Sequence, residues 1–193
     1  MDQEYWDFRW KNKQTGWDLG RPSPPIIEYF TQVPNKNLSI LIPGCGNAYE
    51  AEELSNMGFK RITLLDISSK AVENIKSRFT DNPNVAIHHQ DYFHHDVQYD
   101  VIVEQTFFCA LPRNKRLDYI KKTSELLKPN GKVIGLLFNK EFDSEDPPFG
   151  GTLQEYHKLF SKEFDIKRLE TCYNSITPRL SWELFFIFIK RSL

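Results

Sequence analysis

The sequence is poor in cysteine, nearly neutral and free of long apolar runs, and each shortage excludes a class of protein. Among 193 residues only Cys45, Cys109 and Cys172 are cysteines. Their odd number and wide spacing argue against a disulfide framework or a zinc site and fit a reducing cytosol. The 25 basic and 26 acidic residues give a formal net charge of -1. A nucleic-acid binder that neutralises phosphates would show a basic excess, so no nucleic-acid partner is expected.

Membrane and targeting signals are also missing. The apolar run from Phe185 to Ile189 is far too short to span a bilayer. The first residues, Asp2, Gln3 and Glu4, lack the basic and apolar parts of a secretory signal. With 40% hydrophobic and 26% charged residues, the composition is that of a globular protein. We therefore expect one cytoplasmic domain over residues 1–193, monomeric and with no membrane partner.

Strands and helices alternate through most of the chain. Short apolar runs bounded by turn residues predict five strands, and residues at helical spacing predict helices between them. The predicted strands are Leu38–Ile42, Arg61–Leu65, Asn84–His88, Tyr99–Val103 and Lys132–Phe138. The predicted helices are Pro24–Phe30, Ala48–Met57, Ser68–Phe79 and Asn114–Leu127, the last closed by Pro129-Asn130-Gly131.

The pattern changes after the fifth strand. A helix is expected from Leu153 to Phe160, followed by two β-rich segments, Phe164–Cys172 and Leu180–Ile189, whose short link suggests antiparallel pairing. Strand–helix alternation predicts an α/β fold with a doubly wound, mostly parallel sheet, closed here by an antiparallel pair. Residues 1–22 are rich in tryptophan and charge without a clean period, so they form an N-terminal appendage.

The most informative segment is the turn after the first strand. Gly44 and Gly46 let the backbone adopt positive φ and approach a ligand closely. Asp66 ends the second strand, 22 residues after Gly44, where a carboxylate can accept hydrogen bonds from both hydroxyls of a ribose. Ligands of doubly wound sheets sit outside the carboxyl ends of the strands. The combination predicts an adenosine-containing cofactor.

Two cofactors compete for this turn. A dinucleotide fingerprint needs glycine, or a residue close to it in size, at its sixth position, and Tyr49 stands there. S-adenosylmethionine has no phosphate and needs only backbone contact with its amino-acid end. We therefore predict S-adenosylmethionine. A nicotinamide-dependent oxidoreductase and an S-adenosylmethionine-binding protein without methyl transfer remain the alternatives.

Later polar residues extend the candidate site. Asp91, after the third strand, could accept a hydrogen bond from the adenine amino group, and Tyr92 could cover the ring. Glu104 ends the fourth strand, where a carboxylate would lie near the methionine part of the cofactor or the substrate. Each could equally be a loop residue or a solvated strand end. The histidine cluster His88, His89, His94 and His95 is either a metal site or a polar strand end and loop, and the second interpretation is favoured.

Several segments resemble the thiopurine S-methyltransferase superfamily, and within it the halide/thiol methyltransferases of the plant harmless-to-ozone-layer type. The N-terminal tryptophans with Asp18-Leu19-Gly20-Arg21 match the tryptophan spacing and W-D-x-G-R signature of that family. The other matching segments are Leu41–Asn47, Asp66-Ile67-Ser68, Phe107–Leu111 and Glu125–Gly131. The resemblance implies a seven-stranded sheet with its last strand antiparallel and an N-terminal lid, residues 1–22, folded over the cofactor.

The resemblance also implies roles for individual residues. Trp6, Trp10 and Trp17 would line the pocket. Gly44 would contact the methionine part, Asp66 the ribose, Asp91 with Tyr92 the adenine, and Glu104 would lie near the methionine part. Phe149 stands where the family often carries tyrosine, which puts transfer of the substrate preference in doubt. Ala48 replaces the third glycine of the G-x-G-x-G run of other methyltransferases.

The predicted reaction is an in-line displacement of a methyl group from sulfonium by a small nucleophile. A dry pocket favours it, because the charges of an anionic nucleophile and the sulfonium cancel in the transition state. Aromatic faces also favour the cation. The predicted acceptor is a thiol, thiopurine, bisulfide, thiocyanate or halide. Such an acceptor reacts as an anion and needs no general base, so no catalytic base is assigned. Trp17, Arg21 and Phe149 are candidate positioning residues.

Overall fold

A seven-stranded sheet forms the centre of the computed structural model, which describes residues 1–191, in the strand order β3-β2-β1-β4-β5-β7-β6. Pairing among the first five strands is parallel, and β7 runs antiparallel to both of its neighbours. The predicted α/β fold is confirmed. The strands are β1 Ser39–Pro43, β2 Arg61–Asp66, β3 Val85–His89, β4 Tyr99–Gln105, β5 Leu127–Phe138, β6 Phe164–Thr171 and β7 Glu183–Lys190.

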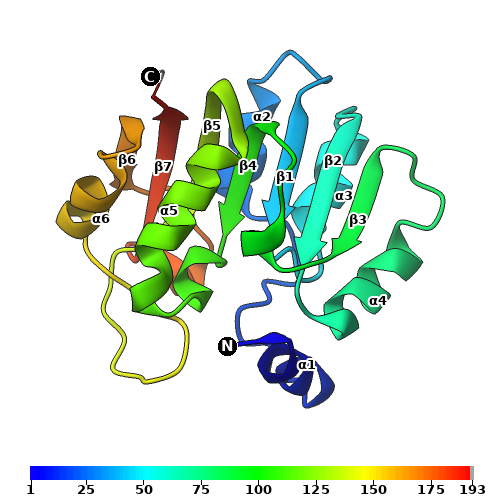
Figure 1. Ribbon diagram of the computed structural model, residues 1–193, viewed down its shortest axis with the longest axis horizontal. Coiled ribbons are helices and arrows are strands. Elements are labelled where there is room, and N and C mark those ends of the chain that lie inside the picture. The colour runs from blue at the N-terminus through cyan, green and yellow to red at the C-terminus, as the bar shows by residue number, and fades with distance from the viewer. Residues whose placement is uncertain (192–193) are drawn as a thin grey trace.

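Helices cover both faces of the sheet (Figure 1). On one face α2 (Pro24–Thr31), α3 (Tyr49–Asn56) and α4 (Ser69–Arg78) pack against alternate strand residues such as Ile40 and Val103. On the other face α5 (Arg116–Glu125) and α6 (Leu153–Phe160) bury aromatic side chains. None of the helices in the described part of the chain has the length and apolar character needed to cross a bilayer.

The N-terminal segment contains a helix that the sequence did not predict. Helix α1 (Gln3–Lys11) begins at Asp2, whose carboxylate accepts a hydrogen bond from the Tyr5 backbone N–H at 3.0 Å. No residue of α1 is fully buried. Trp6 and Trp10 line a cavity and Phe8 is exposed, so the apolar residues of α1 do not gather on one core-facing side and leave no clear helical period in the sequence. Figure 1 shows α1 beyond the carboxyl ends of the central strands, where it contacts α4.

Three predicted boundaries were wrong in the second half of the chain: the end of α5, the start of β5 and the start of β7. Helix α5 ends at Glu125, and Leu127 already belongs to β5, because Leu127 is fully buried and pairs with Tyr99. The expected stop at Pro129-Asn130-Gly131 lies inside β5, where the pairing with β4 shifts register instead of ending. Strand β7 begins at Glu183 and not at Leu180, since a 3₁₀ turn (Thr177–Arg179) precedes it.

The strand order reverses between β1 and β4. The chain leaves β1 toward α3 and β2 on one side, and leaves β4 toward α5 and β5 on the other. The loops after these two strands therefore diverge and leave a crevice at their carboxyl ends. The glycine turn and the end of β4 are both placed at this crevice.

Candidate functional site

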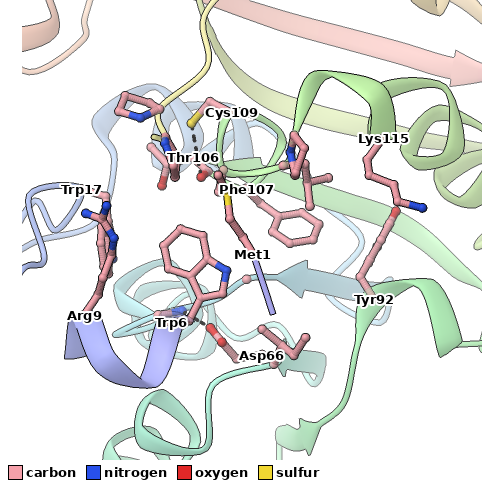
Figure 2. Close-up of a pocket in the computed structure, with 18 of the residues that line it drawn as sticks. Met1, Trp6, Arg9, Trp17, Asp66, Tyr92, Thr106, Phe107, Cys109 and Lys115 are labelled. Carbon is pink, nitrogen blue, oxygen red and sulfur yellow. Dashed lines mark hydrogen bonds between the residues drawn. The ribbon is translucent and has the colours of Figure 1, made fainter. Parts of the chain in front are cut away.

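A cavity of about 690 Å³ occupies the crevice at the carboxyl ends of β1, β2 and β4. Figure 2 shows Trp6 of α1 pointing into it, opposite Phe107 and above Asp66. Eight of the site residues singled out in the sequence line this cavity: Trp6, Trp10, Trp17, Gly44, Gly46, Asp66, Asp91 and Tyr92. Residues as far apart in the chain as Trp6 and Tyr92 are thus brought together by the parallel sheet and the returning N-terminus.

The turn after β1 has the backbone geometry of a close-approach ligand site. Gly44 and Gly46 have φ values of +55° and +51°, in the left-handed region that glycine occupies without strain. A Cβ on Gly44 would collide with the Phe107 ring, and one on Gly46 would point at Trp10 and Trp17. A hydrogen bond from Cys45 N–H to the Leu65 carbonyl, at 3.2 Å, fixes the turn against β2.

Asp66 presents a buried carboxylate at the end of β2. Its Oδ2 accepts a hydrogen bond from Gly46 N–H at 3.0 Å, and its Oδ1 accepts one from Ser68 N–H at 2.9 Å. Burial raises the pKa of this carboxyl above its usual value, and the two backbone hydrogen bonds offset part of that effect. Each oxygen keeps a free lone pair. Asp66 can therefore accept two further hydrogen bonds, as from the hydroxyls of a ribose.

Three tryptophans form an aromatic roof. The rings of Trp6 and Trp17 meet edge to face with centroids 5.4 Å apart, and those of Trp10 and Trp17 do so at 5.8 Å. Arg179 donates a hydrogen bond to the Trp17 carbonyl at 2.9 Å and so ties this roof to the loop before β7. Such packed rings exclude water and offer electron-rich faces to a cation.

Helix α1 is attached on two sides of the cavity. On one side, Asp7 of α1 accepts hydrogen bonds from the hydroxyls of Ser68 at 2.6 Å and Ser69 at 2.8 Å and from Lys70 N–H at 3.2 Å. Burial opposes the charge on Asp7, but these donors at the start of α4 lower its pKa to about 2. On the other side, Asp146 receives a hydrogen bond from Tyr5 at 3.3 Å and pairs with Arg9 at 3.4 Å.

Tyr92 and Glu104 are more deeply placed than the sequence suggested. Tyr92 lines the cavity, but its hydroxyl is 2.7 Å from Thr123 and its ring stacks on Tyr119, so the hydroxyl is committed to the core. Glu104 is 1% exposed and lies outside the cavity lining. It accepts hydrogen bonds at 2.8 Å from Phe107 N–H, Phe108 N–H and the Tyr119 hydroxyl. Burial raises its pKa to about 7.

Glu104 therefore supports the loop that follows β4. That loop turns sharply, since Thr106 has φ of +58°. It presents Thr106, Phe107 and Cys109 to the cavity. Cys109 is buried, and desolvation raises the pKa of its thiol well above the usual range, so this cysteine packs as a neutral thiol.

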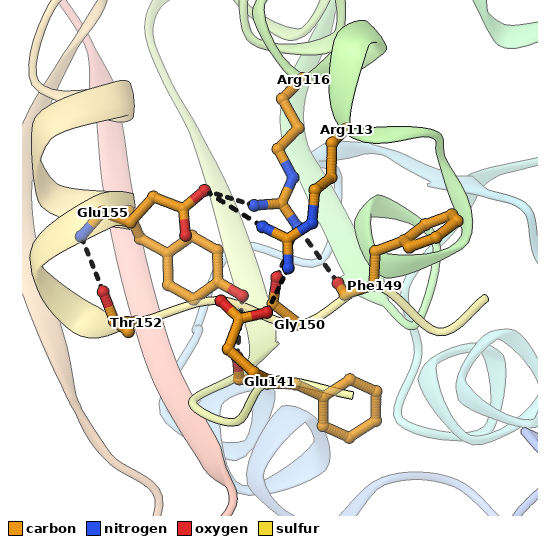
Figure 3. A network of polar contacts seen from close by, with 9 residues as sticks. Arg113, Arg116, Glu141, Phe149, Gly150, Thr152 and Glu155 are labelled. Carbon is orange, nitrogen blue, oxygen red and sulfur yellow. Dashed lines mark hydrogen bonds and ion pairs between the residues drawn. The ribbon is translucent and has the colours of Figure 1, made fainter. Parts of the chain in front are cut away.

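Phe149 and Arg21 also lie away from the main cavity. The Phe149 backbone crosses the loop after β4, where its N–H donates to the Cys109 carbonyl at 2.7 Å. Figure 3 shows how this crossing is held: Arg116 donates to the Phe149 and Gly150 carbonyls and pairs with Glu155 at 2.5 Å. The segment before this crossing brings Phe142, Pro147 and Pro148 into the cavity wall. Arg21 lines a smaller, adjoining cavity.

Sequence reasoning missed several cavity residues from the second half of the chain. They come from the ends of β4 and β5 and from the loop before β7: Thr106, Phe138, Phe142, Pro147, Pro148, Arg179 and Trp182. The Pro178-Arg179 and Trp182 positions lie in an irregular loop, and nothing in their local spacing indicates a site. Only sheet pairing brings β7 beside β5 and places this loop at the cavity.

The histidine cluster is held by hydrogen bonds within the protein. His95 Nδ1 lies 3.0 Å from the side-chain amide oxygen of Gln90 and its Nε2 lies 2.8 Å from the Tyr99 hydroxyl, and His89 Nε2 lies 3.0 Å from the Ile67 backbone carbonyl. Within residues 1–191, no three histidine, cysteine or carboxylate side chains gather as they would around a metal ion. The cluster supports the β3 end of the sheet.

Fold and site together define a protein of the doubly wound α/β class whose cavity combines a glycine turn, a buried carboxylate with free lone pairs and an aromatic roof. The model of the family "Thiopurine S-methyltransferase (TPMT)" matches residues 1–184. The chain belongs to this family. It is accordingly a methyltransferase whose cofactor is S-adenosylmethionine, as the sequence predicted.

Two relatives illustrate the match. "Probable thiol methyltransferase 2" of Arabidopsis thaliana is 32% identical over 159 residues, which cover 80% of this chain and 70% of that protein. "Thiopurine S-methyltransferase" of Vibrio parahaemolyticus is 26% identical over 180 residues, covering 83% of this chain and 82% of that protein.

The fold is also that of solved structures with little sequence identity. A Burkholderia thailandensis 1,6-didemethyltoxoflavin-N1-methyltransferase with bound S-adenosylhomocysteine superposes with a TM-score of 0.79 at 12% identity, covering 98% of this chain and 87% of that one. A TehB-like S-adenosylmethionine-dependent methyltransferase from Corynebacterium glutamicum gives 0.69 at 16% identity and covers 98% of both chains. Neither is similar enough to indicate a substrate.

Proposed function

We propose that this methyltransferase acts on a small sulfur or halide nucleophile: a thiol, a thiopurine, bisulfide, thiocyanate or a halide. The names of its relatives support this class, since they include a thiol and a thiopurine methyltransferase and a thiocyanate methyltransferase of Brassica oleracea, 26% identical over 164 residues. The acceptor is a small molecule, and nucleic acid is not a partner. One domain, residues 1–193, acts as a monomer in the cytoplasm, with residues 1–22 as its lid.

One observation carries the proposal: the cavity is walled by aromatic and cationic side chains and holds no histidine. None of the residues that line it within the described chain is a histidine, and its one cysteine has a raised pKa. Arg9, Lys115 and Arg179 bring positive charge to the wall, and the carboxylates that also line it are Asp66 and Asp91 at the proposed cofactor end and Asp2 at the start of α1. An acceptor that arrives already as an anion fits such a wall, because it requires no base and is attracted by these cations.

The cofactor's half of the cavity follows from the polar groups at the strand ends. S-adenosylmethionine, when bound, supplies an electrophilic methyl group on a sulfonium. Asp66 would hold its ribose, the Gly44–Gly46 turn would approach its amino-acid end, and Asp91 with Tyr92 would lie at its adenine. These residues fit the group, since each Asp66 oxygen keeps a free lone pair and the two glycines, at positive φ, expose their backbone without a side chain in the way.

The part of the cavity proposed to hold the acceptor is formed by side chains that position the acceptor and exclude water. Trp6 and Trp17 cover the cavity from α1 and the segment after it, and Phe107 and Phe138 wall it from the ends of β4 and β5. Bringing an anion into this aromatic enclosure strips its hydration and holds it near the electrophile. Arg179 keeps Trp17 in place by its hydrogen bond to the Trp17 carbonyl.

The first test is incubation of the protein with methyl-labelled S-adenosylmethionine and separate panels of thiols, bisulfide, thiocyanate, iodide and thiopurines. Transferred label in one panel identifies the acceptor class. No transfer to any panel by a protein that binds S-adenosylhomocysteine would refute the proposed acceptor class and direct the search to larger acceptors or a binding role.

A substitution tests the positioning mechanism. Trp17→Ala removes a ring from the roof and is expected to lower kcat/KM for the best acceptor by roughly 10- to 100-fold, or about 1.4–3 kcal/mol. Phe8→Ala is the matched control, because Phe8 lies on the outer face of the neighbouring helix α1 and is 59% exposed. Equal kcat/KM values for Trp17→Ala and the unmodified protein would contradict catalysis by positioning and desolvation.

A further inference from the structure

Two side chains of α1 hold a single carboxylate at the rim of the main cavity. The Tyr5 hydroxyl donates a hydrogen bond to Oδ1 of Asp146 at 3.3 Å, and the Arg9 guanidinium pairs with its Oδ2 at 3.4 Å. Tyr5 and Arg9 lie one helical turn apart on the same side of α1, with the guanidinium carbon 4.8 Å from the centre of the Tyr5 ring. Together they present a neutral and a charged donor to the two oxygens of one carboxylate.

Arg9 lines the cavity and is the cation there whose charge is least committed. Arg179 donates to the Trp17 carbonyl at 2.9 Å. Lys115 lies on the opposite side of the cavity from Arg9 in Figure 2, beside Tyr92 at the proposed adenine end. The Arg9 side chain is only 22% exposed, and within residues 1–191 its guanidinium makes a single ion pair, at the rim. A second anion brought into the cavity can therefore compete for it.

Asp146 is a weakly held partner for Arg9. Its side chain is 62% exposed, and exposed ion pairs contribute little to stability because solvent screens them. The loop that carries it, residues 139–152, is anchored on either side of Asp146 by an ion pair from Glu141 and by a hydrogen bond from Phe149 N–H at 2.7 Å. Asp146 can therefore leave Arg9 while both anchors of the loop stay in place.

The position of the Asp146 carboxylate adjoins the cavity without being part of its lining. Pro147 and Pro148, the next two residues, line the cavity on one side of this position, and Arg9 lines it on the other. Asp2 also lines the cavity, and its carboxylate caps α1 by accepting a hydrogen bond from a backbone N–H. A ligand in the cavity can thus extend a carboxylate to the rim, away from the atom that reacts.

We propose that Tyr5 and Arg9 form a carboxylate subsite, which Asp146 occupies in this structure and which the carboxylate of a thiol acceptor takes over when that acceptor binds. The subsite rests on the proposed function, because it gives the acceptor a second anionic group besides the reacting sulfur. Two donors directed at two oxygens suit a planar carboxylate, whereas a halide or thiocyanate offers no such pair of oxygens. Tyr5 and Arg9 are thus residues that determine acceptor specificity.

The experiment uses thiols that differ in charge and hardly in shape. Mercaptopropionate, mercaptobutyrate and mercaptohexanoate are each compared with the corresponding neutral amide. Calorimetry gives their Kd for the complex of the protein with S-adenosylhomocysteine, and the label-transfer assay gives kcat/KM. The variants are Arg9→Met, Tyr5→Phe and Asp146→Asn. Lys11→Met and Glu145→Gln are the matched controls, because each removes the same charge from an exposed position of the same helix or loop.

We expect at least one carboxylate to bind the unmodified protein roughly tenfold more tightly than its amide, a difference of about 1.4 kcal/mol. Arg9→Met should abolish this preference, and Tyr5→Phe should reduce it about threefold. Asp146→Asn should increase it about threefold, because the competing anion of the protein is gone. The two control variants should keep the preference of the unmodified protein.

The opposite signs expected for Arg9→Met and Asp146→Asn distinguish a binding site from a structural latch. If the ion pair only held α1 over the cavity, both variants would weaken acids and amides alike, and the proposal would be overturned. Acids that bind the unmodified protein no better than their amides would overturn it as well. Label transfer to the amides with equal Kd values would support the proposed function without the subsite. Arg9-dependent binding of the acids without label transfer to any thiol would support the subsite and contradict a thiol acceptor.

Discussion

The attachment of α1 to α4 depends on Asp7, and Asp7→Asn tests whether this contact closes the site. The carboxylate accepts from two serine hydroxyls and from Lys70 N–H at the start of α4. Asparagine keeps the shape but loses the charge and one acceptor oxygen. The variant therefore removes the favourable interaction of an anion with a helix N-terminus and at least one hydrogen bond.

The size of the effect follows from capping energies. An N-cap replacement costs about 1 kcal/mol, and an anion at a helix N-terminus contributes about 0.3–1 kcal/mol. Because Asp7 is only half-buried, solvent screens its charge, and we take about 1 kcal/mol for the whole contact. With RT near 0.6 kcal/mol, this lowers the docked-to-undocked ratio of α1 about fivefold.

Tryptophan fluorescence reports the docking directly, since Trp6 and Trp10 lie on α1 and Trp17 follows it. Asp7→Asn should increase quenching by acrylamide and weaken the Kd of S-adenosylhomocysteine by up to about fivefold. Glu4→Gln is the matched control: it removes the same charge from an exposed position of the same helix.

The pH dependence has a definite sign. The pKa of Asp7 falls from 3.8 to about 2 on folding, so its contribution is present above pH 3.8 and is lost as the pH falls through about 2. The unmodified protein should lose α1 protection in that interval, and Asp7→Asn should show no such step. Identical quenching in Asp7→Asn and Glu4→Gln at pH 7 would refute the idea that Asp7 holds the lid.

Two further predictions concern the glycine turn and the buried acid of β4. Gly44→Ala places a side chain at positive φ, where it collides with the Phe107 ring. We expect about 1–3 kcal/mol of destabilisation by thermal unfolding and loss of S-adenosylhomocysteine binding. Gly58→Ala is the control: its Cβ meets open space at φ +90°, so this variant should keep binding. Burial raises the pKa of Glu104 from 4.5 to about 7, so its contribution to stability is largest below pH 4.5 and is lost as the pH rises through about 7. Between pH 4.5 and about 7, the unfolding free energy of the unmodified protein should therefore fall by up to about 3 kcal/mol relative to that of Glu104→Gln. The measurement is denaturant unfolding of both proteins at a series of pH values. Parallel curves of unfolding free energy against pH would contradict the raised pKa of Glu104.

Much of the fold and several residues of the cavity lining were predictable from local signals. The strands of the parallel sheet are short apolar runs, which the sequence pattern reveals. The glycines after β1 mark the crevice because only glycine adopts their positive φ without strain. Asp66 marks it because an acid ends the apolar run of β2. The W-D-x-G-R segment indicated the family. By contrast, α1 left no clear helical period, because Trp6 and Trp10 line the cavity while Phe8 is exposed.

The sequence by itself determined the α/β architecture, the position of the glycine turn and the family, because these depend on hydrophobic periodicity, on glycine at positive φ and on short motifs. Only the tertiary structure decided which side chains meet. It placed Glu104 and Phe149 outside the cavity lining and brought Arg179 and Trp182 into it. These outcomes depend on strand alternation and sheet order, which bring together residues far apart in the chain, and no local pattern encodes such contacts.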